Sequence, residues 1–433
     1  MPIDPADPAS LPGVADAPDA LDSPDAPDAP DAAAAPLVSP LLDAHTAAGA
    51  TFTDFAGWQM PVRYTSDLAE HHAVRTAAGL FDLSHMGEIL VIGSGAADAL
   101  DAAVTGRMSQ LAVDQAKYTL ILDERGGVLD DLIVYRTGED RFLVVANAGN
   151  RSVVAEALRE RVDGFDAVVE DETDDVALIA IQGPRSTEIL QDVELLTVDG
   201  HSVEEALAAL RYYRVLHAAF DGLPVLIART GYTGEVGYEI FVSPGKARLL
   251  WDSLLETGAG AGLVPAGLAA RDTLRLEAGM PLYGHELGRD ILPRQAGLGR
   301  AVALTAPDGT DHEFVGRAGV VADAAPEPDS LLSGRVLVGL ASEGRRAGRA
   351  GYAVLDADGR RVGIVTSGAL SPTLGHPIAM AYVDADVADP GTGLAIDVRG
   401  SALPATVVEL PFHRRAPIPA PVQAATVDAP AAS

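Results

Sequence analysis

The feature that most constrains the fold is a run of three strand-like segments with very short gaps between them. Residues 118–122, 128–135 and 142–147 are rich in aliphatic, aromatic and β-branched side chains, and Gly, Asp and Glu fill the gaps. Gaps of this length join antiparallel neighbours, because a parallel crossover needs a dozen or more residues. A helix predicted over 151–161 closes the unit. The pattern predicts an α+β domain built on an antiparallel sheet.

The middle segment carries two adjacent acids, Asp130 and Asp131, shortly after a Gly126-Gly127 turn. Side chains alternate between the two faces of a strand, so Asp131 shares a face with Tyr135 and Asp130 lies on the other. Asp131 should therefore point toward whatever the tyrosine lines. The alternative is a turn-flanking acid at a frayed strand start, and the segment alone does not decide between them.

A similar alternation of strands and helices occurs later in the chain. Its predicted strands are 177–182, 225–228 and 238–242, and its predicted helices are 247–256 and 269–277. Two related α+β units are therefore expected. Ahead of the antiparallel run, 89–92 is predicted as a strand and 96–104 as a helix.

Beyond about residue 300 helical periodicity fades. Short strand candidates follow one another at 336–341, 352–355, 362–367, 378–383 and 394–398, separated by Gly, Asp and Pro. This spacing is typical of a small all-β barrel or a sandwich.

Near the start of the globular sequence, 41–45 is predicted as a short helix and 54–62 as an irregular loop with aromatic side chains. His71 and His72 follow Glu70 and superficially resemble a metal cluster. Adjacent histidines point in different directions on a helix and no third ligand stands at useful spacing, so helical surface or packing is expected.

The composition excludes several function classes. The chain has no cysteine, which removes disulfides, thiolate metal sites and a cysteine nucleophile, and is compatible with a reducing cytosol. Its formal charge is -31, and residues 36–433 still carry -23 once the eight Asp of residues 1–35 are set aside. Nucleic-acid binding needs a cationic surface, so it is not expected. No run approaches the roughly 20 apolar residues of a membrane helix.

The chain ends are predicted to carry no chemistry. Residues 1–35 are built from Asp, Pro and Ala and are predicted to be a disordered tail, and residues 416–433 are predicted to fray. The glycine-rich segment 258–262 follows a helix, whereas a dinucleotide fingerprint follows a strand, so it is predicted to be a helix-ending turn.

Polar residues in apolar or glycine-rich settings are the candidates for chemistry. They are Asp131, Asn147, the 231–234 turn, Glu239 and Arg271. Two acids, an arginine and nearby tyrosines would suit a pocket for a flat polar heterocycle that carries a carboxylate. Arg271 has the alternative of a salt bridge along its helix. No catalytic triad, phosphate loop or metal signature is present.

From about Pro40 to Phe412 the chain resembles the T-protein family, the aminomethyltransferases of the glycine cleavage system. The segments that carry this resemblance are 54–61, 81–88, 126–135, 181–184, 229–235, 267–280 with Tyr283-Gly284, and 366–375.

The resemblance implies an α+β protein with three domains in a cloverleaf around a folate channel: two antiparallel-sheet α+β domains and a C-terminal β-barrel. Domain 1 would comprise 36–81 and 176–300. Domain 2, 82–175, would be inserted in it and carry Asp131, and domain 3, 301–415, would be the barrel.

The resemblance also implies an enzyme that transfers a one-carbon unit. Its donor would be the aminomethyl group on the dihydrolipoyl arm of H protein, its acceptor tetrahydrofolate, and ammonia would be released. Tetrahydrofolate would be a co-substrate, the lipoyl group would be carried only by the partner, and no metal would be required. A cytoplasmic monomer is expected, meeting H protein and the other glycine cleavage components transiently.

Carried over by position, Asp131 matches the family's catalytic acid. The remaining site positions match folate-binding ones: Glu239, Arg271, Tyr118, Met86, Tyr135, Asn147 and Tyr232. Aromatic side chains suit the face of a pterin, and a glutamate can bind its amino-pyrimidine edge. Arg349 is a further hypothesis for the pocket from the barrel side, with simple surface charge as the alternative.

Two other functions share the implied fold. A folate-dependent demethylase would differ in donor and acceptor around a similar pocket. A folate-binding scaffold for iron–sulfur assembly would need a cysteine-containing motif, which this chain lacks. Fused dehydrogenases of the family carry a flavin domain for which this chain has no room.

Overall fold

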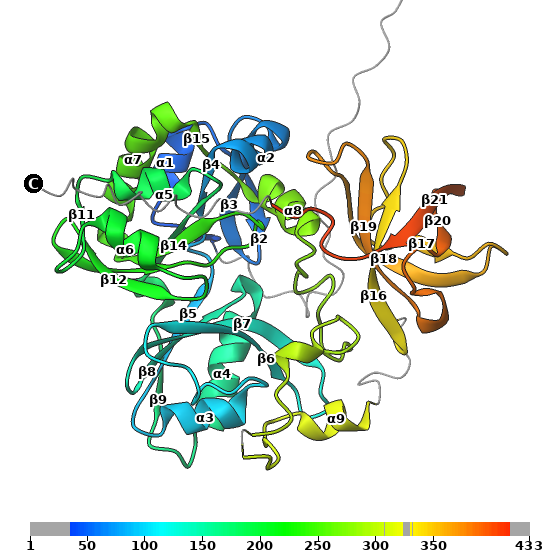
Figure 1. The fold of residues 1–433 in the computed structure, drawn as a ribbon, viewed down its shortest axis with the longest axis horizontal. Coiled ribbons are helices and arrows are strands. Elements are labelled where there is room, and N and C mark those ends of the chain that lie inside the picture. The colour runs from blue at the N-terminus through cyan, green and yellow to red at the C-terminus, as the bar shows by residue number, and fades with distance from the viewer. Residues whose placement is uncertain (1–34, 307, 324–329, 331, 416–433) are drawn as a thin grey trace, which may run out of the picture. The chain divides into compact units, whose positions relative to one another are not determined.

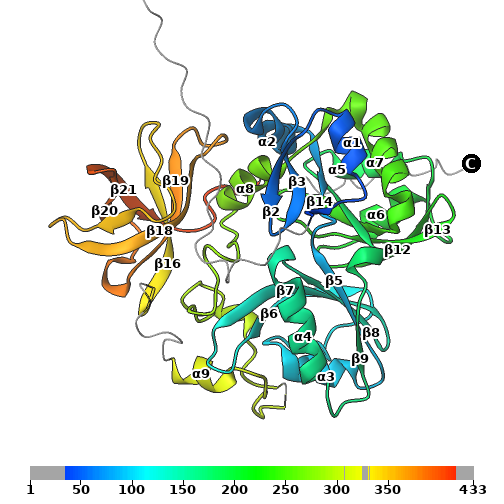
Figure 2. The same ribbon diagram turned by 180° about the vertical axis from the view of Figure 1, so that it is seen from behind.

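The computed structural model describes residues 35–306, 308–323, 330 and 332–415. By contacts between residues, the chain divides into two units, 1–35 and 36–433, and only the second is considered below. The predictions for 1–35, except Ala35, and for 416–433 lie outside the described residues. Figure 1 shows the path of the chain, and Figure 2 shows it from behind.

The largest sheet has seven strands and is almost entirely antiparallel. Its order is β11 (Leu196–Thr197), β12 (Val215–Phe220), β13 (Leu223–Ala228), β14 (Gly237–Val242), β10 (Ala177–Gln182), β4 (Ala78–Asp82) and β15 (Leu263–Pro265). The edge strand β15 pairs with β4 in parallel, which departs from the predicted all-antiparallel sheet. The chain segment before β15 is long and includes a helix, and a connection of this length allows a strand to be added in parallel.

Helices cover one face of this sheet. They are α1 (Leu42–Ala47), α5 (Ser186–Gln191), α6 (Val203–Ala209) and α7 (Pro244–Gly258), and their apolar side chains share one core with the strands. Two further helices, α2 (Asp67–Thr76) and α8 (Leu268–Glu277), lie on the other side, where Val74, Ala270 and Leu274 join a second core.

The second sheet has five antiparallel strands in the order β6 (Gln115–Leu122), β7 (Val128–Gly138), β8 (Arg141–Ala146), β5 (Gly87–Ile92) and β9 (Val168–Asp171). Helices α3 (Ala96–Ala103) and α4 (Arg151–Arg161) cover one of its faces. Its other face meets the seven-stranded sheet, since Tyr135 and Leu143 pack in the same core as Leu178 and Phe241. The two sheets therefore enclose a shared apolar layer.

The C-terminal strands close into a barrel, so the barrel is confirmed over the sandwich. Its order is β16 (Arg335–Ser342), β19 (Pro377–Asp384), β18 (Arg361–Leu370), β17 (Ala353–Leu355), β20 (Gly393–Val398) and β21 (Ser401–Val408), with β21 pairing back to β16. The sequence had not predicted β21. Helix α9 (Arg317–Ala322) precedes the barrel.

The predicted loop at 54–62 is wrong. It is a hairpin of β2 (Thr51–Phe55) and β3 (Trp58–Arg63), to which β1 (Leu37–Val38) adds in parallel. Ala56 and Gly57 have φ of 52° and 81°, the left-handed geometry of a tight hairpin turn. Pro61 and the aromatic side chains had led us to predict an irregular loop instead of this hairpin turn.

The predicted α+β class with a C-terminal barrel is confirmed. The strands of the five-stranded sheet fall between β4 and β10 in the chain, which agrees with an inserted second unit. The domain boundaries themselves remain a prediction. The segment 258–262 does end α7, with Gly262 at φ 82°.

Candidate functional site

Asp131 lies inside β7, three residues after that strand begins, so the frayed-start alternative is wrong. Ile133 and Tyr135 on its face pack in the core between the two sheets. Leu132 and Val134 pack on the other face beneath α3 and α4. The predicted alternation is therefore confirmed, and it directs Asp131 into the layer between the sheets.

The turn before β7 needs glycine. A Cβ on Gly127 would lie 1.9 Å from the carbonyl oxygen of Arg289, which no side chain could tolerate. The backbone N–H of Val128 donates to the carbonyls of Gly288 (3.1 Å) and Ile291 (3.2 Å). The loop that follows α8 is thus held against the start of the strand that carries Asp131.

One amide bridges the acid pair. Asn147 Nδ2 lies 2.8 Å from Oδ1 of Asp130 and 2.8 Å from Oδ1 of Asp131. Tyr118 donates its hydroxyl to Asp131 Oδ2 at 3.1 Å, and Asn150 Nδ2 donates to Asp130 Oδ1 at 2.8 Å. The two carboxyl groups leave opposite faces of β7 and still share a donor, because Asn147 stands at the end of the neighbouring strand β8.

Both carboxyl groups of this pair have a pKa above the usual range of an aspartic acid. Burial and the charge of Asp131 raise the pKa of Asp130 to about 7, against hydrogen bonds from Asn150 and Asn147 that lower it. Burial raises the pKa of Asp131 to about 6, although hydrogen bonds from Tyr118 and Asn147 favour its charged form. Both acids therefore hold protons more readily than free aspartic acids do, and near neutral pH the pair carries fewer than two charges.

Glu239 stands on β14, on the seven-stranded sheet. The Thr230 hydroxyl donates to its Oε2, and the Tyr135 hydroxyl lies 3.5 Å from the same oxygen. Tyr135 belongs to the five-stranded sheet, so this contact joins the two sheets. Burial and the charge of Glu239 raise the pKa of Tyr135, which keeps its hydroxyl protonated as a donor.

Arg271 on α8 stacks on an aromatic ring and retains an unsatisfied donor. Its guanidinium carbon lies 4.9 Å from the centroid of the Tyr232 ring. Its Nη1 is buried and has no hydrogen-bond partner among the described residues. Burial lowers its pKa, and Glu239 opposes that shift. A buried unsatisfied donor costs about 1–3 kcal/mol, so this nitrogen is suited to an acceptor atom of a ligand.

The candidate residues form one neighbourhood. The charge of Asp131 acts on the pKa of Tyr118 and Tyr232, and the charge of Glu239 acts on those of Arg271 and Tyr135. Met86 is half-buried and packs against the apolar core that contains Tyr135. The structure thus links all eight predicted site residues through hydrogen bonds, packing contacts or charge interactions.

The tight turn at 229–235 positions Tyr232. Gly231 has φ 155°, and a Cβ there would lie 2.1 Å from Gln182 Oε1, so only glycine fits. The Gln182 amide donates to the Thr230 carbonyl at 3.2 Å, and its oxygen accepts from the Thr233 hydroxyl at 3.0 Å. The tyrosine hydroxyl donates to the Pro281 carbonyl, which fixes the ring beneath Arg271.

Some residues of this neighbourhood were not predicted as site residues. They are Asp130, Asn150, Thr230, Tyr283 and Tyr213. Asp130 had been noted as one of the acid pair, but strand alternation placed it on the opposite face, and Asn147 contacts both carboxyl groups. Thr230 and Tyr283 lie in segments that carry the family resemblance, whereas Asn150 and Tyr213 had no recognisable sequence signal.

Of the two adjacent histidines, His71 is buried packing and His72 is exposed on the surface of α2, the two settings that were expected. His71 Nδ1 lies 2.7 Å from Thr273 Oγ1 and its Nε2 2.9 Å from Thr373 Oγ1. Across the described part of the chain, no three His, Asp or Glu side chains gather as metal ligands would. Nor, within the same residues, is any helix long and apolar enough to cross a membrane.

Tyr213 has a strained backbone. Its φ of 58° lies in the left-handed region, which costs a residue with a large side chain about 1–2 kcal/mol. Its N–H donates to the Arg229 carbonyl (3.1 Å) and its carbonyl accepts from the Ala116 N–H (2.9 Å), so both sheets hold it. Burial and the charges of Glu239 and Asp131 raise the pKa of its hydroxyl.

We predict that Tyr213→Gly weakens ligand binding without unfolding the protein. Relief of backbone strain should offset the lost ring contacts, so the thermal midpoint should stay within a few degrees of the parent. The affinity for tetrahydrofolate, the ligand that the family resemblance implies, should fall about tenfold. Calorimetry and thermal unfolding check this. Asp221→Gly, at another left-handed position (φ 47°), is the control and should leave affinity unchanged. Unchanged affinity for Tyr213→Gly would contradict the prediction.

Comparison with known proteins gives the class of protein that this fold and site define. The family described as "GCVT N-terminal domain" matches residues 41–306, and the family described as "Glycine cleavage T-protein C-terminal barrel domain" matches 335–413. The chain therefore belongs to the glycine cleavage T-protein family.

Proteins similar to this chain over most of its length are named aminomethyltransferases. A protein named aminomethyltransferase from Saccharopolyspora erythraea is 55% identical over 382 residues, covering 88% of this chain and 99% of that protein. An aminomethyltransferase from Cutibacterium acnes is 54% identical over 381 residues, covering 87% and 98%. The structure of the glycine cleavage system aminomethyltransferase T from Bartonella henselae superposes with a TM-score of 0.76 at 36% identity, covering 87% of this chain and 98% of that one. The predicted family and transferase class are confirmed.

Proposed function

We propose that this aminomethyltransferase takes the aminomethyl group from the dihydrolipoyl arm of lipoylated H protein and gives its carbon to tetrahydrofolate. The bonds that join that carbon to the lipoyl sulfur and to its amino nitrogen break, and two bonds to folate nitrogens form. The two hydrogens displaced from the folate nitrogens leave on ammonia and on the lipoyl thiol. The observation that carries the proposal is the buried acid pair bridged by Asn147, together with the unsatisfied nitrogen of Arg271, which stacks on Tyr232.

The residues present fit a folate. A flat, polar ring system needs aromatic walls, a donor for its acceptor atoms and an acid for its amino groups. Tyr118, Tyr135, Tyr232 and Met86 would line the pocket, Arg271 Nη1 would donate, and Glu239 would accept. When bound, tetrahydrofolate supplies the nucleophilic nitrogens that receive the carbon.

Asp131 would handle protons and charge at the reacting atoms. Its carboxylate ionises near pH 6, so at neutral pH it can accept a proton from a folate nitrogen and stabilise positive charge on the transferred carbon. Tyr118 and Asn147 hold it in place through both oxygens. Asp130 would keep Asn147 oriented through its own hydrogen bonds to that residue.

We also propose that the protein works in the cytoplasm as a monomer that meets H protein and the other glycine cleavage components transiently. The bacterial relatives support the compartment. The lipoyl arm of H protein has to reach several partner enzymes in turn, and this favours brief contacts over a permanent complex.

The proposal predicts a rate that depends on the ionisation of Asp131. In single-turnover experiments with aminomethylated H protein and tetrahydrofolate, formation of methylenetetrahydrofolate should rise with pH through an apparent pKa near 6. Ionisation is opposed by burial in the folded state, so the contribution of this pair to the free energy of unfolding should decrease as pH rises from about 4 to about 7.

A flat rate between pH 5 and pH 8 would contradict the role of Asp131 in proton transfer. A protein that binds tetrahydrofolate by calorimetry but leaves the aminomethyl group untouched would favour the alternative, a folate-dependent demethylase of the same fold. Binding without turnover of any one-carbon donor would favour a folate-binding scaffold.

A further inference from the structure

A buried arginine that the proposed mechanism does not use joins two segments of the candidate site. Arg75 lies in the last turn of α2, and only 5% of its side chain is exposed. Its Nη1 donates to the Thr233 carbonyl (2.7 Å) and to Glu235 Oε1 (2.8 Å). Both acceptors belong to the turn at 229–235, so one side of the guanidinium holds this turn.

The other side of the same guanidinium binds α8, which lies beside α2 (Figures 1 and 2). Nη2 of Arg75 donates to the Leu274 carbonyl (3.3 Å), and Nη2 and Nε both donate to Glu277 Oε2 (2.8 and 3.1 Å). A guanidinium carries its N–H donors in one rigid plane, and here five hydrogen bonds leave from its three nitrogens. Arg75 therefore bridges the turn and the helix as a single rigid unit.

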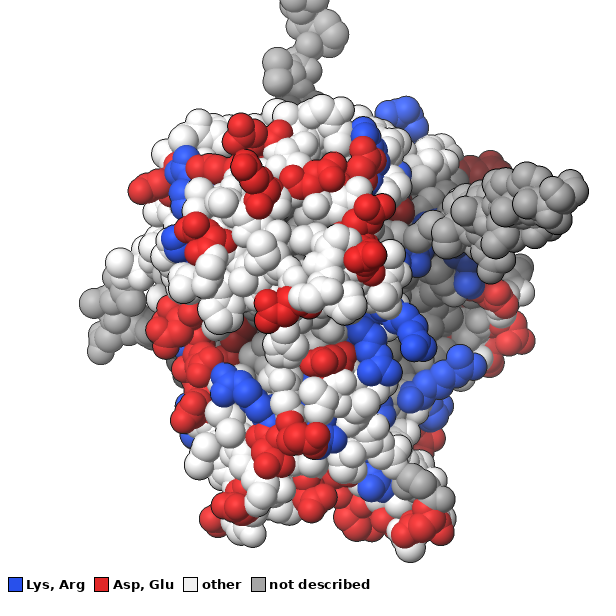
Figure 3. Space-filling view, turned by 60° about the vertical axis from the view of Figure 1, so that its left-hand side comes forward, with Lys and Arg blue, Asp and Glu red and all other residues white. Residues whose placement is uncertain are grey.

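Arg75 is buried in a chain that offers many exposed acids as partners. The sequence has 62 Asp and Glu against 31 Lys and Arg, and Figure 3 shows one face over which acidic side chains are widely spread. Taking a cation out of water is costly even when the cation is paired, whereas a surface ion pair costs little. The burial of Arg75 between Glu235 and Glu277 is therefore explained by the segments that it holds together.

Each of the two bridged segments carries one side chain of the candidate folate pocket. Tyr232 is the residue before Thr233 in the turn, and Arg271 lies one helical turn before Leu274 on α8. The guanidinium carbon of Arg271 lies 4.9 Å from the centroid of the Tyr232 ring, and this stack needs a fixed spacing between turn and helix. A displacement of about 1 Å would redirect the unsatisfied Nη1 of Arg271, a change large enough to weaken a ligand contact.

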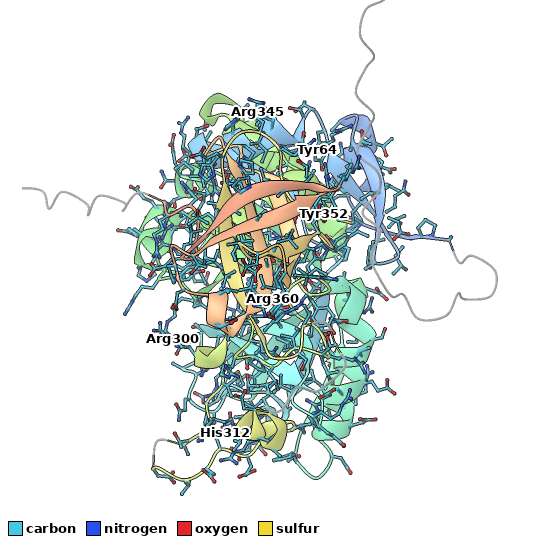
Figure 4. All side chains as sticks on the ribbon, turned by 90° about the vertical axis from the view of Figure 1, so that its right-hand side faces the viewer. Tyr64, Arg300, His312, Arg345, Tyr352 and Arg360 are labelled. Carbon is cyan, nitrogen blue, oxygen red and sulfur yellow. The ribbon has the colours of Figure 1, made fainter. Side chains whose placement is uncertain are left out.

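Packing alone leaves part of α8 without support on its barrel side. A cleft of about 530 Å³ lies there, lined by Thr273 of α8, Leu68 of α2 and barrel residues that include Arg345, Arg346, Arg349 and Arg399. Figure 4 looks onto the barrel and labels Arg345. Arg349, a hypothesis for the pocket from the barrel side, lines this cleft. Since side chains do not fill the space beside Thr273, hydrogen bonds from α2 supply support that packing does not.

We propose that Arg75 is a positioning residue for tetrahydrofolate: it sets the distance between the turn that carries Tyr232 and the helix that carries Arg271, and with it the affinity of the pocket. The inference rests on the proposed function, because it assigns the pocket to a folate. Arg75 acts through the two backbones and does not touch the ligand. A lysine keeps the charge, but its three donors on one nitrogen cannot reach all four acceptors of Arg75.

The test compares Arg75→Lys with the parent in steady-state kinetics with aminomethylated H protein and tetrahydrofolate. KM for tetrahydrofolate should rise about tenfold, and kcat should change less than about threefold, because Asp131 and its hydrogen bonds are untouched. Calorimetry should show the same loss of affinity. A smaller folded fraction would lower the apparent kcat and leave KM unchanged, so the split between KM and kcat separates positioning from instability.

The matched control is Arg161→Lys. Arg161 is half-buried at the end of α4 and donates to the carbonyls of Ala103 (2.8 Å) and Leu122 (2.7 Å), so it also ties separate elements together, on the helix-covered side of the five-stranded sheet. This control should lower the thermal midpoint and leave KM for tetrahydrofolate unchanged. If Arg75→Lys does not fold, Glu235→Gln replaces it, because it weakens only the link to the turn, and it should raise KM about threefold.

Two further measurements test the route through the turn and the helix. In the protein without ligand, amide hydrogen exchange over 229–235 should be faster in Arg75→Lys than in the parent and unchanged in Arg161→Lys. In an Arg271→Met background, adding Arg75→Lys should change the affinity for tetrahydrofolate less than about threefold, because the donor that Arg75 positions is already absent.

Three results would overturn the proposal: an unchanged KM for tetrahydrofolate in the folded variant, an equal rise in the Arg161→Lys control, or full additivity of Arg75→Lys with Arg271→Met. A parent protein that binds no tetrahydrofolate would instead overturn the proposed function. The exchange rates over 229–235 would then still decide whether Arg75 holds the turn, because that measurement needs no ligand.

Discussion

Asp131→Asn will form methylenetetrahydrofolate about 10²–10⁴-fold more slowly than the parent while retaining tetrahydrofolate binding. The amide keeps the size of the carboxyl group but neither accepts a proton nor carries negative charge, the two properties that the transferred carbon requires. Asn147 and Tyr118 both donate to Asp131, so an amide in its place also loses one acceptor. Single-turnover product formation and calorimetry measure the two quantities separately.

The control for this experiment is Asp140→Asn, which changes an exposed acid in the same sheet, in the turn between β7 and β8. It removes the same charge without touching the pocket, and its rate should equal that of the parent. If Asp131→Asn binds folate and retains more than about a tenth of the parent's rate, Asp131 has a positioning role only. If it binds no folate, its main contribution is to the pocket.

Glu277→Ala will lower the free energy of unfolding by about 3–5 kcal/mol. Glu277 is fully buried at the end of α8, where Arg75 donates to Oε2 from Nε (3.1 Å) and Nη2 (2.8 Å). Thr373 donates to it through its backbone N–H (3.0 Å) and its hydroxyl (2.8 Å), which ties α8 to the barrel. Removing Glu277 leaves the buried Arg75 with Glu235 (2.8 Å) as its one remaining carboxylate among the described residues, and it leaves the Ser371 hydroxyl and the Thr373 N–H without their acceptor.

Denaturant unfolding measures this loss, with Glu256→Ala on the exposed side of α7 as the control. His71, Ser371 and Arg75 hold the pKa of Glu277 far below its usual range against the effect of burial. Its stabilisation is therefore present above about pH 4.3, the value of an unperturbed Glu, and is lost as pH falls below it. A loss below about 1 kcal/mol would mean that the surroundings of Arg75 rearrange to satisfy it.

The local pattern of apolar and polar residues was sufficient to predict much of the fold. Strand alternation around Asp131 and Tyr135 correctly assigned their shared face, and short connections correctly predicted the antiparallel five-stranded sheet. Two features that the sequence did not predict show where local pattern is insufficient. The hairpin at 51–63 was missed because Ala56, an alanine, takes a left-handed turn position usually marked by Asn or Gly. The parallel edge β15 depends on a partner, β4, about 180 residues earlier.

The candidate site shows the same division between what the sequence predicted and what only the tertiary structure decided. The sequence, through its resemblance to a family, determined which side chains to examine: Asp131, Asn147, Glu239 and Arg271 among them. Only the tertiary structure decided that Asn147 bridges two acids on opposite faces of a strand, that Tyr135 reaches Glu239 across two sheets, and that Tyr213 is strained. It alone gathered Arg399, Arg345 and Leu68 at one cleft. Periodicity records which way a side chain points from its own backbone, whereas these contacts join distant segments, and their geometry follows from how the sheets, helices and barrel pack together.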